Sequence, residues 1–437
     1  MMQDSDRISQ LPGHVADKIL SLLPIKEAVR TSILSRQWRY QWSSLPHLMF
    51  NDQCTSTNAP GRLSQDLVKI VDEVLLLHTG PIKVFVLNHT GFRVTRDIDR
   101  WILHLSRVSI KQIGLLIYQG QNYKIPTSLF NCQNLTALKL YGCSVKIPSS
   151  FEGFKKLYYL YLQSVELSSG LDVLISRCPL LQRLNLRDLQ GITRVNVETA
   201  CKLRSLDIGG TFLDVAFGDA NCLESVTVDF GPGSGNANLS NLHKFFKNMH
   251  KIQILNVKNY SLKYLALGNV PHTLPHALLH LKDLSICMDF TSKEEILTVM
   301  CLMRSSPQLK KLEFENRPNN RQTTRTGTMA DFWQDHHSFC LEQVQVVSLH
   351  NFRGTEPESE FIKFLLTGLP NLEKMRILGV TSAEEKDKLF KELLPFCRVL
   401  EQASDHSLTR RSGTQPTRIR SHCIESLCNC FTMLRGT

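Results

Sequence analysis

Residues 135–143 read LTALKLYGC, and the same pattern of apolar residues returns four times further along the chain. The pattern is L-x-x-L-x-L or a close variant, in which the last two apolar residues flank one polar residue, as in a short strand buried on one face. The copies begin at Leu157, Leu181, Leu203 and Leu223, so the intervals are 22, 24, 22 and 20 residues. A nearly fixed period of this length indicates a repeat architecture in which neighbouring units stack.

The spacing is that of leucine-rich repeats. Looser copies begin at Ile110, Leu262, Leu281 and Leu309, at intervals of 19 to 39 residues, and residues 292–308 between two of them have helical spacing. No single repeat can bury its own apolar edge, so the repeats must stack. The sequence therefore predicts an α/β fold, an irregular leucine-rich-repeat solenoid with a curved parallel sheet on the concave side and helices outside.

The N-terminal residues 7–42, RISQLPGHVADKILSLLPIKEAVRTSILSRQWRYQW, have helical periodicity instead. A first helix is expected between Leu11-Pro12 and Pro24, and a second directly after Pro24, because apolar residues recur there at i, i+3, i+4 and i+7. Trp38 and Trp42 would share one face of a third short helix that Pro46 ends. The residues that form the first two stripes are Val15, Ile19 and Leu22, then Ile25, Ala28, Val29, Ser32 and Ile33.

This segment has more apolar side chains than three short helices can bury between themselves. Sixteen of the 35 residues from Ile8 to Trp42 are apolar, and Leu20, Leu23 and Leu34 lie off the stripes. Leaving each of these leucines in water forgoes about 1.5 to 3 kcal/mol of burial, and so small a unit is marginal alone. Two explanations stay open from periodicity: a partner protein covers the leucines, or the rest of this chain does.

Residues 6–46, DRISQLPGHVADKILSLLPIKEAVRTSILSRQWRYQWSSLP, resemble the F-box of the large plant family of F-box proteins. The resemblance rests on Leu11-Pro12, the cluster at 19–24, KEAVRTSILS at 26–35 and the paired tryptophans, all in register. In that family the F-box docks on a Skp-type adaptor of a cullin-RING ubiquitin ligase. The resemblance implies that the adaptor contacts are Leu11, Pro12, Ile19, Leu20, Leu23, Pro24, Val29 and Leu34.

The resemblance also implies a different role for Trp38, which would lock the helices together. Two positions depart from the family pattern: Ala16 stands where a larger aliphatic residue is common, and Gln41 where leucine is usual. These departures would weaken docking without abolishing it.

The C-terminal third reads as a strand, a polar turn at Gly354, a helix and a second strand. Residues 346–377, VVSLHNFRGTEPESEFIKFLLTGLPNLEKMRI, resemble the FBD region that follows the repeats in plant F-box proteins, and a further helix is expected at 382–396. The predicted domains are an F-box at 1–50, a connecting segment leading into the solenoid at 51–101, irregular leucine-rich repeats at 102–335, FBD-like terminal repeats at 336–396 and a divergent, disordered tail at 397–437.

Composition argues against several classes of partner. The net charge is +11, but the basic residues are dispersed between acidic ones, which is not the stripe expected for nucleic-acid binding. No run approaches the roughly 20 apolar residues that cross a bilayer, and no secretory pattern opens the chain. The 13 cysteines have no recurring spacing, so they are expected to be reduced in the nucleus and/or the cytoplasm.

No motif in the sequence predicts a catalytic or metal site. Cys423, Cys428 and Cys430 lack the paired C-x-x-C arrangement of zinc sites, and adjacent His336 and His337 point apart. The glycine-rich segment at 230–236 lacks the lysine and hydroxyl of a phosphate loop, and no G-x-S-x-G turn is present. We therefore expect no catalytic residue, no metal and no cofactor.

Taken with the resemblance, these features predict a non-catalytic substrate-recognition subunit of an SCF-type cullin-RING ubiquitin ligase. The alternative is a non-ligase interaction scaffold with a degenerate F-box, and an enzyme on a repeat fold has only dispersed polar residues in its support. The resemblance also leaves open a small-molecule co-ligand, as in plant hormone receptors of this type. The target protein would contact polar strand positions, for which the candidates are Lys139, Tyr141, Tyr159, Tyr161, Asn185, Arg187 and Asp207.

Overall fold

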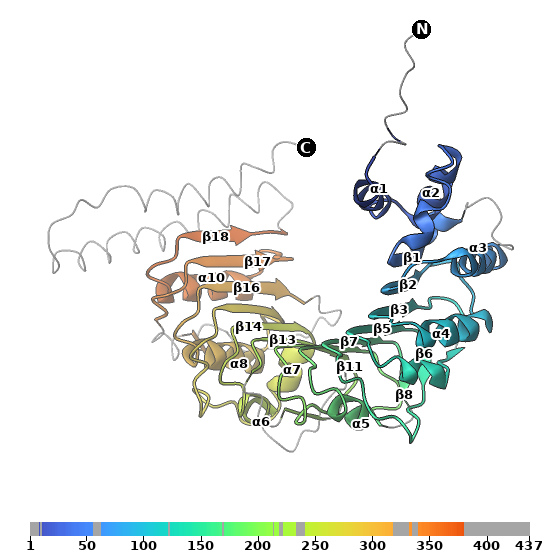
Figure 1. Cartoon of the computed structure of the whole chain (residues 1–437). Helices are drawn as coiled ribbons and strands as arrows, with labels where there is room; N and C mark the ends of the chain where they lie inside the picture. Colours follow the sequence, from blue (N-terminus) through green and yellow to red (C-terminus); the bar gives the residue numbers. More distant parts are fainter. Residues whose placement is uncertain are drawn as a thin grey trace, which may run out of the picture. The chain divides into compact units, whose positions relative to one another are not determined.

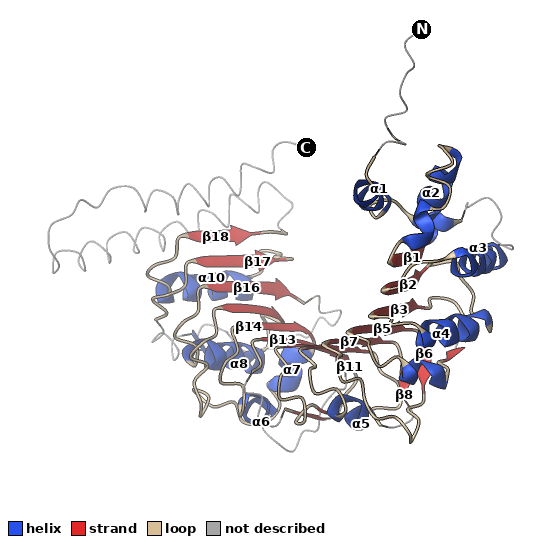
Figure 2. Cartoon of the chain, viewed as in Figure 1, coloured by secondary structure: helices blue, strands red, loops and turns tan. Residues whose placement is uncertain are grey.

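The computed structural model shows two compact units, Met1–Leu203 and Arg204–Thr437. Each is built from parallel strands with helices beside them (Figures 1 and 2). The α/β class predicted from the sequence is confirmed. The structure describes residue 8 and residues 11–55, 63–120, 123–167, 170–212, 214–217, 222–232, 241–317, 332–333 and 340–379.

The first unit contains six five-residue strands in one parallel sheet, in the order β1-β2-β3-β5-β7-β9. Each strand pairs with the next over its full length. Three shorter strands, β4, β6 and β8, form a second parallel sheet beside it. The strands of this unit are β1 (His47–Asn51), β2 (Val84–Asn88), β3 (Gln112–Leu116), β4 (Tyr123–Lys124), β5 (Ala137–Tyr141), β6 (Cys143–Val145), β7 (Tyr159–Gln163), β8 (Glu166–Leu167), β9 (Arg183–Arg187) and β10 (Arg194–Asn196).

The helices beside this sheet bury alternate strand residues. The rings of Phe85 on β2 and Trp101 on a helix lie 6.5 Å apart, and the Trp101 Nε1 donates a 2.7 Å hydrogen bond to Asp72 on another helix. The core of this unit therefore lies between the sheet and these helices. They are α3 (Leu63–Leu77), α4 (Asp97–Arg107) and α5 (Leu171–Ser176), with the 3₁₀ turns η3 (Asp52–Cys54) and η4 (Thr127–Asn131).

The second unit repeats the same plan with seven strands in its main parallel sheet, in the order β11-β13-β14-β15-β16-β17-β18. Phe314 on β16 packs against Phe361 on a helix, with ring centroids 5.0 Å apart. Its strands are β11 (Ser205–Gly210), β12 (Asp214–Ala216), β13 (Ser225–Phe230), β14 (Ile254–Asn259), β15 (Asp283–Met288), β16 (Lys311–Asn316), β17 (Val346–His350) and β18 (Lys374–Ile377). Its helices are α6 (Asn241–Phe246), α7 (Ser261–Leu265), α8 (Lys293–Arg304) and α10 (Glu356–Gly368).

A buried glutamate lies in the first turn of each of the helices α8 and α10. Glu295 pairs with the buried Arg317, and burial raises the pKa of this carboxyl although the neighbouring guanidinium opposes the shift. Glu358 forms a capping box with Thr355 and accepts a 2.5 Å hydrogen bond from Asn316. Glu358 satisfies the backbone amide of the N-cap residue Thr355, and each glutamate ties its helix to the end of β16, through Asn316 or the adjacent Arg317.

The predicted helices at the N-terminus are α1 (Gly13–Leu20) and α2 (Ile25–Arg30), followed by the 3₁₀ turn η1 (Thr31–Ile33). Both predicted starts are confirmed, since Pro12 and Pro24 precede the first helical residues. We refer to residues 11–46, together with Ile8, as the helical module.

The predicted third helix of the module is wrong. Residues 36–40 form turns, and only the 3₁₀ turn η2 (Gln41–Ser44) follows them. The Ser32 hydroxyl donates to the Arg39 carbonyl at 2.8 Å, which closes the loop between the two turns. Short 3₁₀ turns are common as connections between elements. Both tryptophans are nevertheless buried, and Trp38 Nε1 donates to the carbonyl of Ile8 at 3.1 Å.

The predicted position of Leu20 is also wrong. Its side chain is 0% exposed and lies one turn from Ala16 on the inward face of α1, so it belongs to the core of the module. By contrast Leu22 and Ile33, which the stripes predicted to face inward, are 75% and 88% exposed. The helix ends before Leu22, and a 3₁₀ turn advances more degrees per residue than an α-helix, so the stripe of α2 is out of phase at Ile33.

The helical module is attached directly to the start of the sheet. Thr79 and Lys83 donate backbone hydrogen bonds of 2.9 and 2.8 Å to the carbonyls of Ser43 and Pro46. A Cβ atom added at Gly80 would lie 2.7 Å from the backbone of Ser44, so only glycine permits this approach. These contacts fix the orientation of the module relative to β1 and β2.

The burial of Leu20 predicts the outcome of truncating it. Leu20→Ala should lower the free energy of unfolding of the module by about 2 to 5 kcal/mol, because it leaves a cavity. Leu22→Ala removes the same atoms from an exposed site, and its effect should stay within about 0.5 kcal/mol. Urea unfolding of the full chain, followed by the fluorescence of its tryptophans, measures both. Equal effects would contradict the assignment of Leu20 to the core.

Candidate functional site

Exposed apolar side chains gather on the helical module. Among the residues that the structure describes, seven of the nineteen exposed large hydrophobic side chains lie between residues 8 and 40. So many exposed apolar side chains in one short segment make it a candidate for an interaction surface. The seven are Ile8, Ile19, Leu22, Leu23, Ile33, Leu34 and Tyr40, and we refer to them as the apolar surface.

Five residues of the apolar surface lie at or just after the C-terminal ends of two helices. Ile19, Leu22 and Leu23 occupy the last residues of α1 and the turn after it, and Ile33 and Leu34 lie just after α2. Burying each such side chain would contribute about 1.5 to 3 kcal/mol. Their exposure therefore creates a favourable free energy of association with any complementary apolar partner.

The structure places the predicted adaptor contacts at different depths. Ile19, Leu23, Leu34 and Pro12 are exposed, whereas Leu20 is buried. The half-buried residues are Leu11, Pro24 and Val29. Sequence reasoning missed Leu22 and Ile33, the two most exposed leucine or isoleucine side chains of the module, because periodicity assigned them to inward stripes.

A second candidate surface is the face of the sheet that turns away from the helices of the first unit. Six of the seven predicted target-contact residues lie on it, because every second residue of β5, β7 and β9 points to the same side. The register places Lys139, Tyr161 and Asn185 in one row across the three strands. The other residues on this face are Tyr141, Tyr159 and Arg187, whereas Asp207 lies on β11 in the second unit. We refer to this surface of the first unit as the open face.

Aromatic and polar contacts order the side chains of the open face. The Lys139 Nζ lies 5.3 Å from the centroid of the Tyr159 ring, in a cation–π arrangement. Tyr118, in the loop after β3, packs on Tyr141 with ring centroids 4.9 Å apart, and its hydroxyl donates to Asn88 at 3.0 Å. Tyr118 was missed from the sequence because it lies outside the repeat motif.

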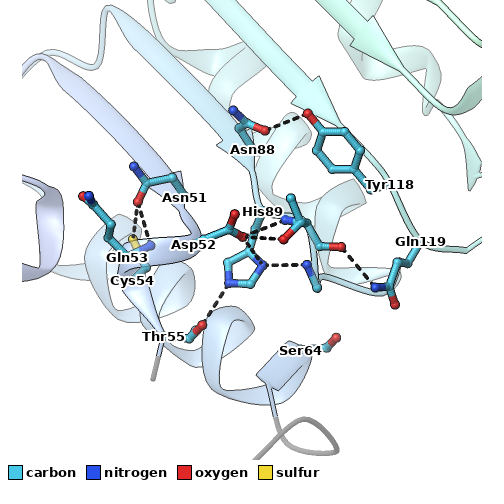
Figure 3. A network of polar contacts seen from close by, with 12 residues as sticks. Asn51, Asp52, Gln53, Cys54, Thr55, Ser64, Asn88, His89, Tyr118 and Gln119 are labelled. Carbon is cyan, nitrogen blue, oxygen red and sulfur yellow. Dashed lines mark hydrogen bonds and ion pairs between the residues drawn. The ribbon is translucent and has the colours of Figure 1, made fainter. Parts of the chain in front are cut away.

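A polar network around the buried His89 holds the end of the open face next to the helical module (Figure 3). The His89 Nδ1 accepts from the Gly91 amide at 3.1 Å, so the neutral ring carries its proton on Nε2 and donates to Thr55 at 2.9 Å. Asp52 accepts from the Thr90 amide at 2.8 Å and lies 3.2 Å from His89 Nδ1. This network ties the ends of β1 and β2 together.

Burial lowers the pKa of His89, and the neighbouring Asp52 only partly offsets this effect. Protonation at Nδ1 would also displace the hydrogen bond from Gly91. The imidazole is therefore held neutral as a structural group.

Comparison with known proteins matches both the N-terminal segment and the repeats to known families. A model of the F-box domain matches residues 8–49, and a model of the leucine-rich repeats of FBD-associated F-box protein At5g56370 matches residues 98–314. F-box/FBD/LRR-repeat protein At1g13570 of Arabidopsis thaliana is 34% identical over 92% of this chain and 98% of its own length. The chain belongs to the F-box/FBD/LRR-repeat family.

Other similar proteins are more distant. FBD-associated F-box protein At5g56370 of Arabidopsis thaliana is 27% identical over 83% of this chain and 87% of its own length. Among solved structures, the Leptospira interrogans LRR protein LIC12759 has a TM-score of 0.37 and 17% identity, over 82% of this chain and 90% of that one. The predicted membership of the plant F-box proteins with repeats and an FBD region is confirmed, and the helical module is their F-box.

The described part of this F-box/FBD/LRR-repeat chain offers no reactive thiol in its core. Burial raises the pKa of the Cys132 and Cys143 thiols to about 12, so both stay protonated. Within the described ranges no group of three or more His, Cys, Asp or Glu residues could hold a metal ion, and none of the helices there is long and apolar enough to cross a membrane. The cysteine cluster at 423–430, the histidine pair at 336–337, the helix at 382–396 and the tail at 397–437 lie outside those residues.

The lowered pKa of His89 predicts a pH dependence. The folded chain keeps the ring neutral, whereas the unfolded chain protonates it near pH 6.5. The contribution of His89 to stability is therefore complete above about pH 6.5 and is lost as pH falls toward the folded pKa. Urea unfolding between about pH 7.5 and pH 5.5 should show a smaller loss of stability in His89→Gln than in the wild type.

The control for this experiment is His47→Gln, which changes an exposed histidine on β1. It should keep the pH dependence of the wild type. If His89→Gln keeps that dependence as well, His89 is not held neutral by the fold.

Proposed function

We propose that this chain is the substrate-recognition subunit of an SCF-type cullin-RING ubiquitin ligase. In this proposal the F-box binds a Skp-type adaptor through the apolar surface, and the repeat units bind a target protein. The observation that carries it is the exposure of Leu22, Leu23, Ile33 and Leu34 on a module whose core is already filled by other side chains. Such a surface supports a partner that covers it.

The two departures from the F-box pattern do not weaken this proposal. Ala16 is buried in the module, so a larger residue there would change the core and leave the exposed surface intact. Gln41 Nε2 donates a 2.9 Å hydrogen bond to Asp17, which links the turn η2 to α1. Both residues act inside the module, and they give little support to the alternative of a non-ligase scaffold with a degenerate F-box.

The contribution of the chain to ubiquitin transfer would be proximity. A receptor that holds a target lysine near an activated ubiquitin raises the effective concentration of the two groups without supplying a catalytic side chain. The backbone hydrogen bonds from Thr79 and Lys83 to the F-box support this role, since a fixed F-box holds the open face at a constant distance from the adaptor. The chain itself would not be an enzyme, and it would act in the nucleus and/or the cytoplasm.

Charge substitution on the apolar surface tests the proposal. The variant Leu22→Asp with Ile33→Asp places two carboxylates where the adaptor would bury apolar side chains, and truncation of central contacts at interfaces commonly costs 2 kcal/mol or more. Binding of a purified plant Skp-type adaptor to the full chain, measured by biolayer interferometry, should weaken by at least about 30-fold. The melting temperature of the free chain should not change, because both side chains are exposed.

The matched control is Leu76→Asp with Leu77→Asp on α3, where the two leucines are 83% and 51% exposed outside the F-box. This variant should bind the adaptor like the wild type. A wild-type chain that does not bind the adaptor at micromolar concentration would favour the scaffold, and equal loss in both variants would refute the assigned surface.

A further inference from the structure

The open face of the first unit has a one-sided charge. Each of its six main strands presents three alternate residues away from the helices, and these positions include three basic residues, Lys139, Arg183 and Arg187, and no aspartate or glutamate. Lys139 and Arg183 are exposed and Arg187 is half-buried. The overall excess of basic residues in the chain does not dictate this distribution, because acidic residues are frequent elsewhere.

The corresponding strand positions in the second unit carry mixed charges. Lysines and arginines alternate there with aspartates and glutamates, and several are paired with each other. Lys311 and His350 both contact Glu313, at 3.2 and 3.1 Å. The acidic positions are Asp207, Asp229, Asp283, Glu313 and Glu315, and the basic ones are Lys258, Lys311, Lys374 and Arg376. The open face therefore suits an acidic partner better than these strand positions of the second unit do.

The spacing of the basic residues suits an extended peptide. Arg183 and Arg187 are four residues apart on β9, which corresponds to about 13 Å along a strand. Lys139 lies two strands away on β5, about 10 Å across the sheet. Carboxylates three or four residues apart in an extended segment have the same separation, so one segment can reach two of the three cations.

Tyrosine side chains surround these cations. Tyr159 and Tyr161 stand on β7, between β5 and β9, and the Tyr118–Tyr141 pair borders them. Tyrosine and arginine are the residue types enriched at protein interfaces, where a ring contributes apolar contact and its hydroxyl a hydrogen bond. The face thus offers apolar contact next to positive charge.

From this charge and geometry we infer that the open face of β5, β7 and β9 binds an extended acidic segment of the target protein. This inference rests on the proposed role as a target receptor and specifies the chemistry of the target. A single-stranded nucleic acid carries one phosphate per nucleotide and binds through a longer basic groove. Three cations over three strands match a few carboxylates better than a continuous polyanion.

Binding of a defined probe to the full chain tests the inference. The probe is a short fluorescein-labelled peptide of Gly and Ser in which every third residue is glutamate and leucines stand between the glutamates. Its binding is measured by fluorescence anisotropy. Lys139→Glu with Arg183→Glu should weaken its binding by at least about tenfold. Because both residues are exposed, the melting temperature should be that of the wild type.

The matched control is Lys258→Glu with Arg376→Glu, which makes the same change in net charge on exposed positions of the second unit. It should bind the peptide within about twofold of the wild type. A peptide with lysine in place of glutamate should bind neither protein.

Three results would overturn the inference. They are equal affinity of the wild type and the Lys139–Arg183 variant for the glutamate peptide, equal weakening by the control variant, and tighter binding of an oligothymidine strand of the same length. The last would identify the face as a nucleic-acid site. Adaptor binding by the same preparations separates this inference from the proposed function: intact adaptor binding with no peptide binding refutes only the acidic segment, and absent adaptor binding refutes only the ligase role.

Discussion

The structure of this protein depends on how few apolar side chains a helical module of some 35 residues can bury. Ala16, Leu20, Ile25, Ala28 and the two tryptophans fill its interior, and the module then has no further volume for the leucines and isoleucines at the ends of its helices. A domain of this size buries a smaller share of its surface than a large one. The remaining apolar residues lie in water unless another protein covers them. The apolar side chains that the module cannot bury therefore form a surface that a partner can cover.

The attachment of the helical module to the sheet holds the apolar surface at a defined position in the first unit. Backbone hydrogen bonds from the segment before β2 reach the last residues of the module, and the His89 network joins the ends of β1 and β2. Parallel strands in full register then carry the open face to β9. Within the first unit, the apolar surface and the open face are thus held on the same continuous scaffold.

The sequence predicted the elements of this fold better than the depth of individual side chains. Repeating leucines located the strands, because a strand buried on one face has a period of two, and the prolines located both helix starts. Leu22 and Ile33 were misplaced because short helices end or change to 3₁₀ geometry within one turn, which shifts a 3.6-residue period. Leu20 was misplaced because the inward face of α1 contains Ala16 and Leu20, whereas the predicted stripe ran through Ile19. Tyr118 and His89 lie beyond strand ends, where only the folded chain brings separate segments together.

The central claim is that the apolar surface stays in water until an adaptor covers it. Hydrogen–deuterium exchange of the full chain, measured with and without a saturating purified Skp-type adaptor, tests this claim most directly. We predict slower exchange of the amides in residues 11–46 when the adaptor is bound, and no change in β5, β7 and β9. Slower exchange only in the strands, or no change anywhere despite saturation, would contradict the account.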